Sequence, residues 1–426
     1  MIGIGCTIGT GIFVITGIAA AKYAGPAISI SYLIAAIVCV FAGLAYAELA
    51  SMVPVSGSAY TYSYAFLGEF VAWAVGWGLI LEYLIGASTV ASGWSGYMVG
   101  ILGSGGIILP EAITKVPYDG GIVNLPAIFI SLFIGFLLYR GTKESIALNR
   151  TLVVVKLIVI FIFLTVSAPM IDFANYDNFA PYGISGILIG SAVVFYAYIG
   201  FDAVATTAEE CKNPERDLPI GIIVSAIACA ILYIAVSLAL TGISDYSTLN
   251  NPEPLARALR ENGSNIGSAL VATGAVAGIT SVLLVLMYSQ SRIFFAMSRD
   301  KMLPEFFGKL DNKTHNPRNS SLVVAFFVAL VSGFMPLEFL SNMVSLGTLF
   351  AFIIVSVGVL ILRKYEPNIK RSFRCPAVNI TAPIAILSCS YLVFELLKQN
   401  GWYFLGWAVL GLIVYLSYGF RKSPLK

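Results

Sequence analysis

The sequence Ile4-Gly-Cys-Thr-Ile-Gly-Thr-Gly-Ile-Phe13 places three glycines within seven positions of an apolar run. A second apolar run, Phe195-Tyr-Ala-Tyr-Ile-Gly-Phe-Asp202, carries a glycine and an acid near its middle. Glycine in a helix interior costs about 1 kcal/mol relative to alanine, so clustered glycines favour local unwinding. The two runs therefore predict helices that are broken part-way along their length.

The composition places these runs in a membrane protein. The chain has 426 residues, of which 58% are hydrophobic and 11% charged, and its mean hydropathy is +0.88. Soluble domains carry about 25% charged residues, so this chain lacks the charge to cover a water-exposed surface. Apolar runs near the roughly 20 residues that a helix needs to cross a bilayer recur along its length. We predict an all-α integral membrane protein with a single transmembrane domain over residues 1–426.

Several other classes of protein are excluded by the same counts. The net charge of +3 is small and spread along the chain, so no basic stripe for nucleic acid is present. The single histidine, His315, cannot supply a metal cluster. No nucleophile–base pair stands out either. We therefore expect no enzymatic activity, no metal and no cofactor.

Apolar runs separated by loop signals predict about twelve spans. They lie near residues 1–22, 27–52, 68–101, 123–139, 149–169, 186–209, 220–243, 265–298, 320–334, 342–362, 378–398 and 402–420. The Ser- and Tyr-rich residues 55–64 are predicted to form a loop.

Lysine and arginine predict the orientation of these spans. Eighteen of the 25 lie in one set of alternate loops and the C-terminal tail, and five lie in the opposite set. Basic loops face the cytoplasm in most membrane proteins, so we predict cytoplasmic N- and C-termini in the plasma membrane. Because no basic segment precedes the first apolar run at Met1, we also expect the first helix to be truncated at its N-terminal side.

The two predicted breaks suit a zwitterion. Unwound backbone at membrane depth is tolerated where it is buried in protein or lines a cavity. Its free N–H groups fit a carboxylate, and its free carbonyls fit an ammonium group or Na⁺. A free amino acid carries both charges a short distance apart. The alternative is that the glycines serve only close helix packing.

Lys156 lies inside the fifth predicted span. A lysine at this depth costs at least about 2.5–3.5 kcal/mol on insertion scales, so a functional role is the first hypothesis. The amine could carry a transported proton or act as a fixed cation where Na⁺ would otherwise bind. The alternative is that Lys156 reaches the cytoplasmic surface, since Arg150 is only six residues away.

Five of the acids in or near the predicted spans are candidate functional residues. Glu82 and Asp202 are nearest the centre, where each could contact a substrate, carry a proton or make a structural hydrogen bond. Glu48, Glu209 and Glu210 lie near the cytoplasmic ends of spans 2 and 6. We interpret these three as gate residues or structural ion pairs with Arg292 or with neighbouring loop residues.

Four stretches of the sequence resemble one family across the whole chain. They are Ile8-Gly-Thr-Gly-Ile-Phe13; Val53-Pro-Val-Ser-Gly-Ser-Ala-Tyr-Thr-Tyr62; Phe195-Tyr-Ala-Tyr-Ile-Gly-Phe-Asp202 followed by Glu209-Glu-Cys-Lys-Asn-Pro214; and Ser291-Arg-Ile-Phe-Phe-Ala-Met-Ser-Arg-Asp300. In combination they resemble the amino acid–polyamine–organocation permeases, in particular prokaryotic homologues of the cationic amino acid transporters.

The resemblance implies a fold of two inverted five-helix repeats, at residues 1–169 and 186–362, with helices 1 and 6 broken at mid-membrane. Two peripheral helices would follow at 378–420. Alternating access would take place around a central site between the repeats.

The same resemblance implies a set of site residues. The substrate carboxylate would meet Gly9, Thr10 and Gly11, and the ammonium group would meet backbone carbonyls of Thr7, Tyr196, Ala197 and Ile199, with Ile8 in the same substrate-binding segment. Lys156 would replace a sodium ion, near the first-helix backbone and Thr280 or Ser281. Phe195 and Tyr196 would contribute to the extracellular gate, and Glu82, Asp202 and Leu286 would surround the substrate side chain.

Leu286 stands where the cationic carriers of this group have a small residue. A leucine would shorten the pocket and favour small neutral amino acids, such as alanine, over arginine. The sequence therefore predicts a secondary amino acid transporter that symports protons. The alternatives are a sodium-independent uniporter or exchanger, a cationic amino acid carrier, and a membrane amino acid sensor. The expected partners are an amino acid, H⁺ and the lipid bilayer, with a monomer as one possible oligomeric state.

Overall fold

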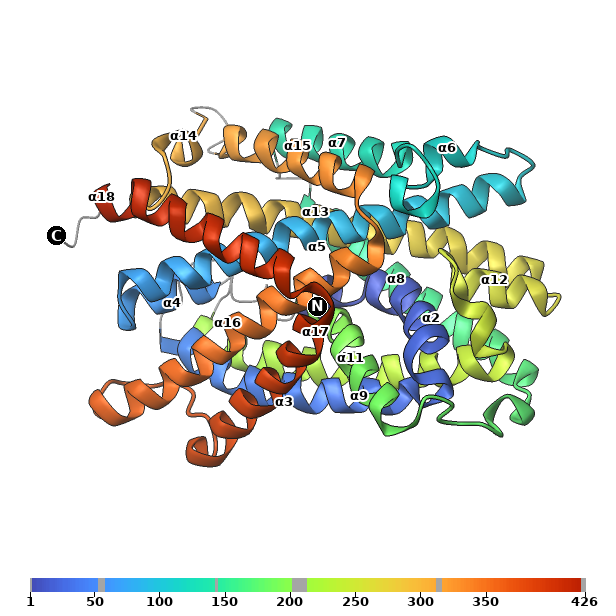
Figure 1. Ribbon diagram of the computed structural model, residues 1–426, viewed down its shortest axis with the longest axis horizontal. Helices are drawn as coiled ribbons and strands as arrows, with labels where there is room; N and C mark the ends of the chain where they lie inside the picture. The colour runs from blue at the N-terminus through green and yellow to red at the C-terminus, as the bar shows by residue number, and fades with distance from the viewer. Residues whose placement is uncertain (1, 53–57, 142–144, 201–212, 312–315, 423–426) are drawn as a thin grey trace.

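The computed structural model describes residues 2–52, 58–141, 145–200, 213–311 and 316–422 (Figure 1). Helices make up 84% of the structure, and the described ranges contain no strand. The prediction of an all-α membrane protein is confirmed.

Helical segments lie at each predicted span. In chain order they are α1 (Ile2–Thr7), η1 (Gly11–Ile15), α2 (Thr16–Ala19) and η2 (Ala20–Ala24); α3 (Ile28–Met52); α5 (Glu69–Ser104); α7 (Leu125–Arg140); α8 (Ser145–Ser167); α9 (Gly183–Val194) and η7 (Phe195–Tyr198); α11 (Pro214–Ile243); α13 (Asn265–Arg299); α15 (Arg318–Phe334); α16 (Leu337–Tyr365); and α17 (Val378–Val414), η10 (Tyr415–Gly419) and α18 (Phe420–Lys422). Between them lie the shorter segments η3 (Gly25–Ala27), α4 (Ser58–Phe66), α6 (Glu111–Thr114), η4 (Pro117–Asp119), η5 (Ala168–Met170), η6 (Phe173–Tyr176), η9 (Tyr246–Leu249), α12 (Pro254–Glu261) and α14 (Glu305–Gly308).

Many of these helices are apolar enough for a bilayer. By length and composition, seven helices of the described chain can cross a membrane, and shorter apolar helices lie at Leu125–Arg140, Gly183–Tyr198 and Arg318–Phe334. The protein is therefore a multi-pass membrane protein.

The loop predicted at residues 55–64 is wrong from Ser58 onward, because α4 begins there. Tyr60 and Tyr62 are fully buried, and the ring of Tyr62 packs edge-on against Tyr46 of α3. Serine and tyrosine have weak helix propensity, but burial of the aromatic rings overrides it.

The last two predicted spans form one helix, α17, rather than two. Figure 1 shows the ribbon of α17 bending so that its start and α18 lie toward the same end of the molecule. Asn400 and Gly401, which stand between the two predicted spans, both lie within α17. The break predicted between residues 398 and 402 was therefore not found.

Helices at equivalent positions of the two predicted repeats pack against each other. α3 packs on α11, α5 on α13, and α7 on α15. The broken segments meet between these pairs, where η1 contacts η7. Inverted repeats would give this pairing, although the division into repeats itself stays a prediction.

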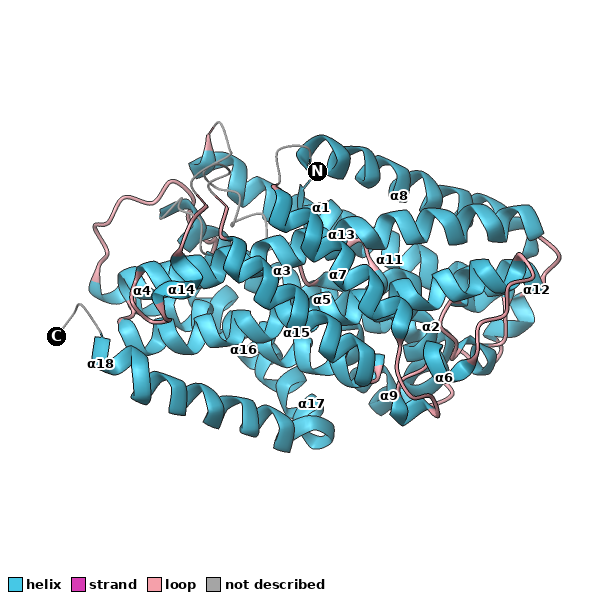
Figure 2. Ribbon diagram, turned by 90° about the horizontal axis from the view of Figure 1, so that it is seen from above, coloured by secondary structure: helices cyan, strands magenta, loops and turns pink. Residues whose placement is uncertain are grey.

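The two ends of the bundle carry different short helices. Figure 1 shows α4, α14, α18 and the C-terminus at one end, and α6 and α12 at the other. Figure 2, turned by 90°, shows the same separation. The loops at the first end hold most of the basic residues, which is the asymmetry behind the predicted orientation.

Candidate functional site

The first span is interrupted between Thr7 and Gly11. α1 ends at Thr7, and the chain resumes as a π-helical turn that begins at Gly11. The amides of Ile12 and Phe13 both donate to the carbonyl oxygen of Gly9, each at 3.2 Å. The break therefore falls on the glycine-rich stretch that predicted it, and backbone groups on both sides of it become available to side chains.

The second break follows η7. Ile199 is extended, and Gly200 has a φ of +108°, a conformation that favours glycine. The two breaks touch: a Cβ atom on Gly200 would lie 3.0 Å from the backbone carbon of Cys6, and one on Gly11 would lie 2.5 Å from Cα of Ala197. Glycine at both positions is what allows the interrupted backbones to meet. The half of the sixth predicted span beyond Gly200 lies outside the described residues.

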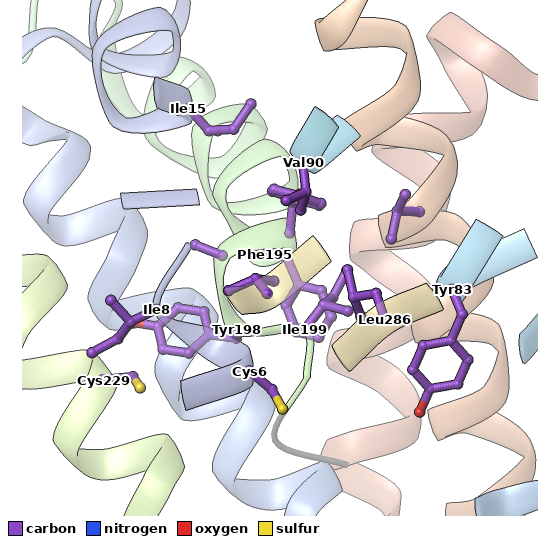
Figure 3. Close-up of a cluster of buried hydrophobic side chains, with 14 of the residues drawn as sticks. Cys6, Ile8, Ile15, Tyr83, Val90, Phe195, Tyr198, Ile199, Cys229 and Leu286 are labelled. Carbon is purple, nitrogen blue, oxygen red and sulfur yellow. The ribbon is translucent and has the colours of Figure 1, made fainter. Parts of the chain in front are cut away.

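A small buried cavity lies at this meeting point. Its lining comes from both breaks and from α5 and α13: Cys6, Thr7, Gly9, Thr10, Gly11, Gly86, Val90, Tyr196, Ile199, Val282 and Leu286. The volume of this cavity is about 20 Å³, which is room for about one water molecule. Figure 3 shows Val90, Ile199 and Leu286 converging on one another, with Cys6 nearby. In this conformation the central cavity is too small to hold an amino acid.

Lys156 of α8 reaches the first break from outside the cavity. It is fully buried, and its Nζ atom donates to the carbonyl oxygens of Gly5 at 2.5 Å and Ile8 at 3.0 Å. Backbone carbonyls are ligands that also suit a metal cation. The side chain therefore does not reach the surface, and the role of Lys156 in place of a sodium ion stays a prediction.

Thr280 and Ser281 lie on the neighbouring helix α13. Gly278 allows the close approach, because a Cβ atom there would lie 3.0 Å from Cβ of Lys156. The hydroxyl of Thr280 accepts a hydrogen bond from Trp94 at 3.0 Å, and that of Ser281 donates to the carbonyl of Gly278 at 2.8 Å. Their predicted role beside Lys156 stays a prediction.

Tyr233 of α11 joins the two breaks and was missed by the sequence analysis. Its buried hydroxyl lies 2.7 Å from the carbonyl oxygen of Thr7 and 2.8 Å from that of Ala197. These are two of the carbonyls predicted to meet a substrate ammonium group. The only sequence signal was a polar aromatic residue in an otherwise apolar span. Nothing in the spacing linked it to Ala197, 36 positions away, or to Thr7, 226 positions away.

The profile of a family described as amino acid permease matches residues 1–416. The chain belongs to the amino acid permease family. The resemblance to the amino acid–polyamine–organocation permeases is confirmed. Members of this family are membrane transporters, which are not enzymes, and the chain is accordingly assigned to amino acid transport.

Two individual relatives cover the whole chain, and a third covers most of it. It is 43% identical to the branched-chain amino acid permease BcaP of Bacillus subtilis, over 100% of this chain and 92% of the relative. It is 42% identical to the methylthioribose transporter of Bacillus subtilis, over 100% and 93%. It is 39% identical to the vacuolar cationic amino acid transporter 4 of Arabidopsis thaliana, over 86% and 62%.

Of the three residues predicted to surround the substrate side chain, one borders the central cavity in the described structure. Leu286 lines the central cavity, opposite Gly86, where a Cβ atom would lie 3.6 Å from Cδ1 of the leucine. Glu82 is buried on α5, one helical turn from Gly86, but is not part of the lining. Asp202, Glu209 and Glu210 lie outside the described residues.

The predicted gate residues of the permease lie in η7. Tyr196 lines the cavity, and Phe195 is fully buried with its ring 6.2 Å from that of Phe352 on α16. The remaining cavity wall was not predicted, since apolar residues in a transmembrane helix give no signal of which face borders a cavity. It consists of Cys6, Gly86, Val90 and Val282.

Glu48 does not pair with Arg292. Its carboxylate accepts hydrogen bonds from Arg363 at 2.8 Å and Arg371 at 3.1 Å, and from the backbone amide of Cys375 at 2.7 Å. Arg292 instead lies over the ring of Tyr288. The interpretation of Glu48 as an ion pair is correct. Its partners are Arg363 in the last turn of α16 and Arg371 in the loop that follows, and no sequence pattern connects either residue to α3.

Proposed function

We propose that this permease transports small, neutral, apolar amino acids by alternating access, with proton coupling through Lys156. The observation that carries the proposal is the cavity at the junction of the two helix breaks. It combines open backbone at both breaks with an apolar wall on the other side. Backbone groups suit the charged ends of an amino acid, and the wall suits an uncharged side chain.

The wall supports the substrate class. Val90, Val282, Ile199 and Leu286 border the cavity, and none of them offers a partner for a guanidinium or ammonium group. Burying such a charge without a partner is costly. An alanine-sized to leucine-sized side chain meets no such penalty. The branched-chain permease among the relatives supports the same class.

Lys156 supports the coupling step. Among the described residues, both of its hydrogen bonds go to carbonyl oxygens of the first helix, at the end where α1 gives way to the break. Gain or loss of a proton at Nζ changes its attraction for these carbonyls, and so biases the position of α1. A proton arriving with the substrate would favour one arrangement of the broken helix, and its release would favour the other.

Uptake into proteoliposomes tests the proposal. The purified permease is reconstituted, and labelled leucine, alanine and arginine are followed with and without an inward proton gradient. Gradient-stimulated uptake of leucine and alanine, with little uptake of arginine, is expected. Arginine as the preferred substrate would contradict the substrate class, and unlabelled methylthioribose as competitor tests the activity named for one relative.

Two further arms separate the mechanisms. Uptake that ignores the proton gradient but rises when the vesicles are preloaded with amino acid would indicate an exchanger, with Lys156 as a permanent cation. Saturable binding without any uptake would indicate a sensor. Empty liposomes and the Lys156→Met variant serve as controls, because the variant keeps the volume of the side chain but cannot hold a proton.

A further inference from the structure

A buried tyrosine of α3 holds the outer half of the first broken helix from outside the central cavity. Tyr32 is fully buried, and it does not line that cavity. Its ring packs against two other buried tyrosines, with ring centroids 5.4 Å from Tyr233 and 6.3 Å from Tyr198. Any effect of Tyr32 on a substrate is therefore transmitted through the backbone that it holds.

The hydroxyl of Tyr32 reaches the start of the π-helical turn η1. It lies 3.2 Å from the carbonyl oxygen of Gly11 and 2.7 Å from the hydroxyl of Thr16, which is also fully buried. Oγ1 of Thr16 lies 3.0 Å from the carbonyl oxygen of Ile12 and 3.2 Å from that of Gly11. Two side-chain hydroxyls, one from α3 and one from the broken helix, thus converge on the carbonyls of one turn.

The two hydroxyls act as one unit. Hydroxyl oxygens that are 2.7 Å apart share a proton. Either Tyr32 donates to Thr16 and Thr16 donates to a carbonyl, or Thr16 donates to Tyr32 and Tyr32 donates to the carbonyl of Gly11. In each arrangement one proton reaches a carbonyl at the start of η1. If one hydroxyl is lost, the other still supplies a donor, so the full effect requires the loss of both.

The backbone of Tyr32 is fixed from the second break. The hydroxyl of Tyr198, in η7, donates to the backbone carbonyl oxygen of Tyr32 at 2.9 Å. One residue of α3 is therefore bonded to η7 through its main chain and to η1 through its side chain. The start of η1 is thereby held in a fixed position relative to the second break.

The turn held by this pair of hydroxyls begins the outer half-helix. The first amides of a helix have no partner within it and form the positive end of the helix dipole. Gly11, whose carbonyl is held, also lines the central cavity. We propose that Tyr32 and Thr16 are positioning residues that orient this helix start toward the carboxylate of the amino acid. This rests on the proposed amino acid transport, and it gives two residues outside the cavity a part in substrate affinity.

Substrate affinity of variants without these hydroxyls tests the role. Labelled leucine is titrated at equilibrium against the permease in lipid nanodiscs. Tyr32→Phe and Thr16→Val each remove one hydroxyl, and each should raise the Kd for leucine about threefold. The double variant removes both donors, so its Kd should rise about tenfold. In proteoliposomes the KM for leucine should rise in parallel, while the maximal rate of uptake stays within about twofold of that of the unmodified permease.

A ligand without a carboxylate separates positioning from a general loss of structure. Leucinol keeps the ammonium group and the side chain of leucine but has a hydroxyl in place of the carboxylate. The double variant should therefore weaken the binding of leucine several times more than it weakens competition by leucinol. Thr16→Ser keeps the hydroxyl and should retain the affinity of the unmodified permease.

Tyr176→Phe is the matched control. The hydroxyl of Tyr176 donates to the carbonyl oxygen of Leu238 at 2.6 Å, so the same kind of bond is removed, but Tyr176 does not line the central cavity. This variant should leave the Kd, the KM and the maximal rate unchanged.

The outcomes separate the positioning role from the proposed function. An unchanged Kd for leucine in the double variant, or an equal loss of affinity for leucine and leucinol, overturns the positioning role and leaves amino acid transport intact. If the unmodified permease neither binds nor takes up leucine and alanine, the proposed function fails, and the positioning role fails with it. The single variants decide by the same comparison if the double variant does not fold.

Discussion

The ammonium group of Lys156 lies 2.5 Å from the carbonyl oxygen of Gly5, which links two helices that are 151 positions apart in the sequence. A second bond to the carbonyl of Ile8 holds the same group at 3.0 Å. The lysine of α8 thus stabilises the end of α1, at the start of the break that borders the central cavity. A change at Lys156 is transmitted directly to the backbone expected to bind the substrate.

Replacing Lys156 with methionine should therefore abolish coupled uptake. The substitution leaves the carbonyls of Gly5 and Ile8 without the ammonium group, so the break loses its partner. We expect proton-driven uptake of leucine to fall at least tenfold in proteoliposomes, while Lys156→Arg retains part of it. Full gradient-driven uptake by Lys156→Met would contradict a coupling role.

Gly11→Ala should block the meeting of the two breaks. The new Cβ atom would lie 2.5 Å from both Cα and Cβ of Ala197, so backbone has to move. We expect at least a tenfold loss of uptake at equal amounts of folded protein. Gly103→Ala on α5 is the control, because nothing lies within 4 Å of the new atom, and it should gain up to about 1 kcal/mol of helix stability. Equal activity of the two variants would rule out the contact as a requirement.

Leu286→Ser should admit longer side chains. The leucine borders the cavity opposite Gly86, so removing it lengthens the apolar pocket. Arginine is expected to compete with labelled leucine about tenfold better than in the unmodified permease. Leu286→Ala separates volume from polarity, because it enlarges the pocket without adding a hydroxyl. The steric explanation fails if neither variant improves competition by arginine.

Glu48→Gln should destabilise the end of the bundle where α16 meets α17. The carboxylate and the side chain of Arg371 are each 1% exposed, and Arg363 pairs with the same carboxylate. Breaking a buried ion pair by removing one partner costs about 3–5 kcal/mol. A lower melting temperature in detergent is expected. Glu261→Gln is the control, since its half-exposed pair with Arg257 should contribute less than about 1 kcal/mol.

Cys375 should react slowly with maleimide near neutral pH. Burial, and then the neighbouring Glu48 carboxylate, raise the pKa of its thiol to about 11. Because the thiolate is the reactive form, the rate should rise roughly tenfold for each pH unit between pH 7 and pH 9. Glu48→Gln removes the negative charge, lowers this pKa and speeds the reaction. Mass spectrometry of the peptide that contains Cys375 measures the rate, and a pH-independent rate would contradict the raised pKa.

Patterns local to the sequence predicted the helices well. Length and hydropathy of the apolar runs predicted the spans, because a helix in lipid must satisfy its own backbone groups and bury an apolar surface. Clustered glycines predicted the break that the structure places between Thr7 and Gly11. The main errors, α4 and the continuous α17, are places where burial of tyrosines or helix continuation through Gly401 overrides local propensity.

No local sequence pattern predicted which residues form hydrogen bonds or ion pairs between distant helices. Tyr233 bonds to carbonyls of both breaks, Glu48 binds arginines more than 300 positions away, and Asn342 donates to Gln399, which is 57 positions away. Each of these residues is a polar side chain in an apolar helix, and the sequence alone does not distinguish one that pairs locally from one that reaches across the bundle.

The sequence by itself determined that this is a helical membrane protein with broken helices, and it pointed to the permease family and to Lys156. Those features depend on composition, on the spacing of glycines and on a charge in an apolar run, all of which are local. Only the tertiary structure decided which carbonyls Lys156 contacts, which side chains enclose the central cavity and which arginines pair with Glu48. Side chains in a helix bundle meet according to helix rotation and packing, and these are set by the summed contacts of the whole chain rather than by any one segment.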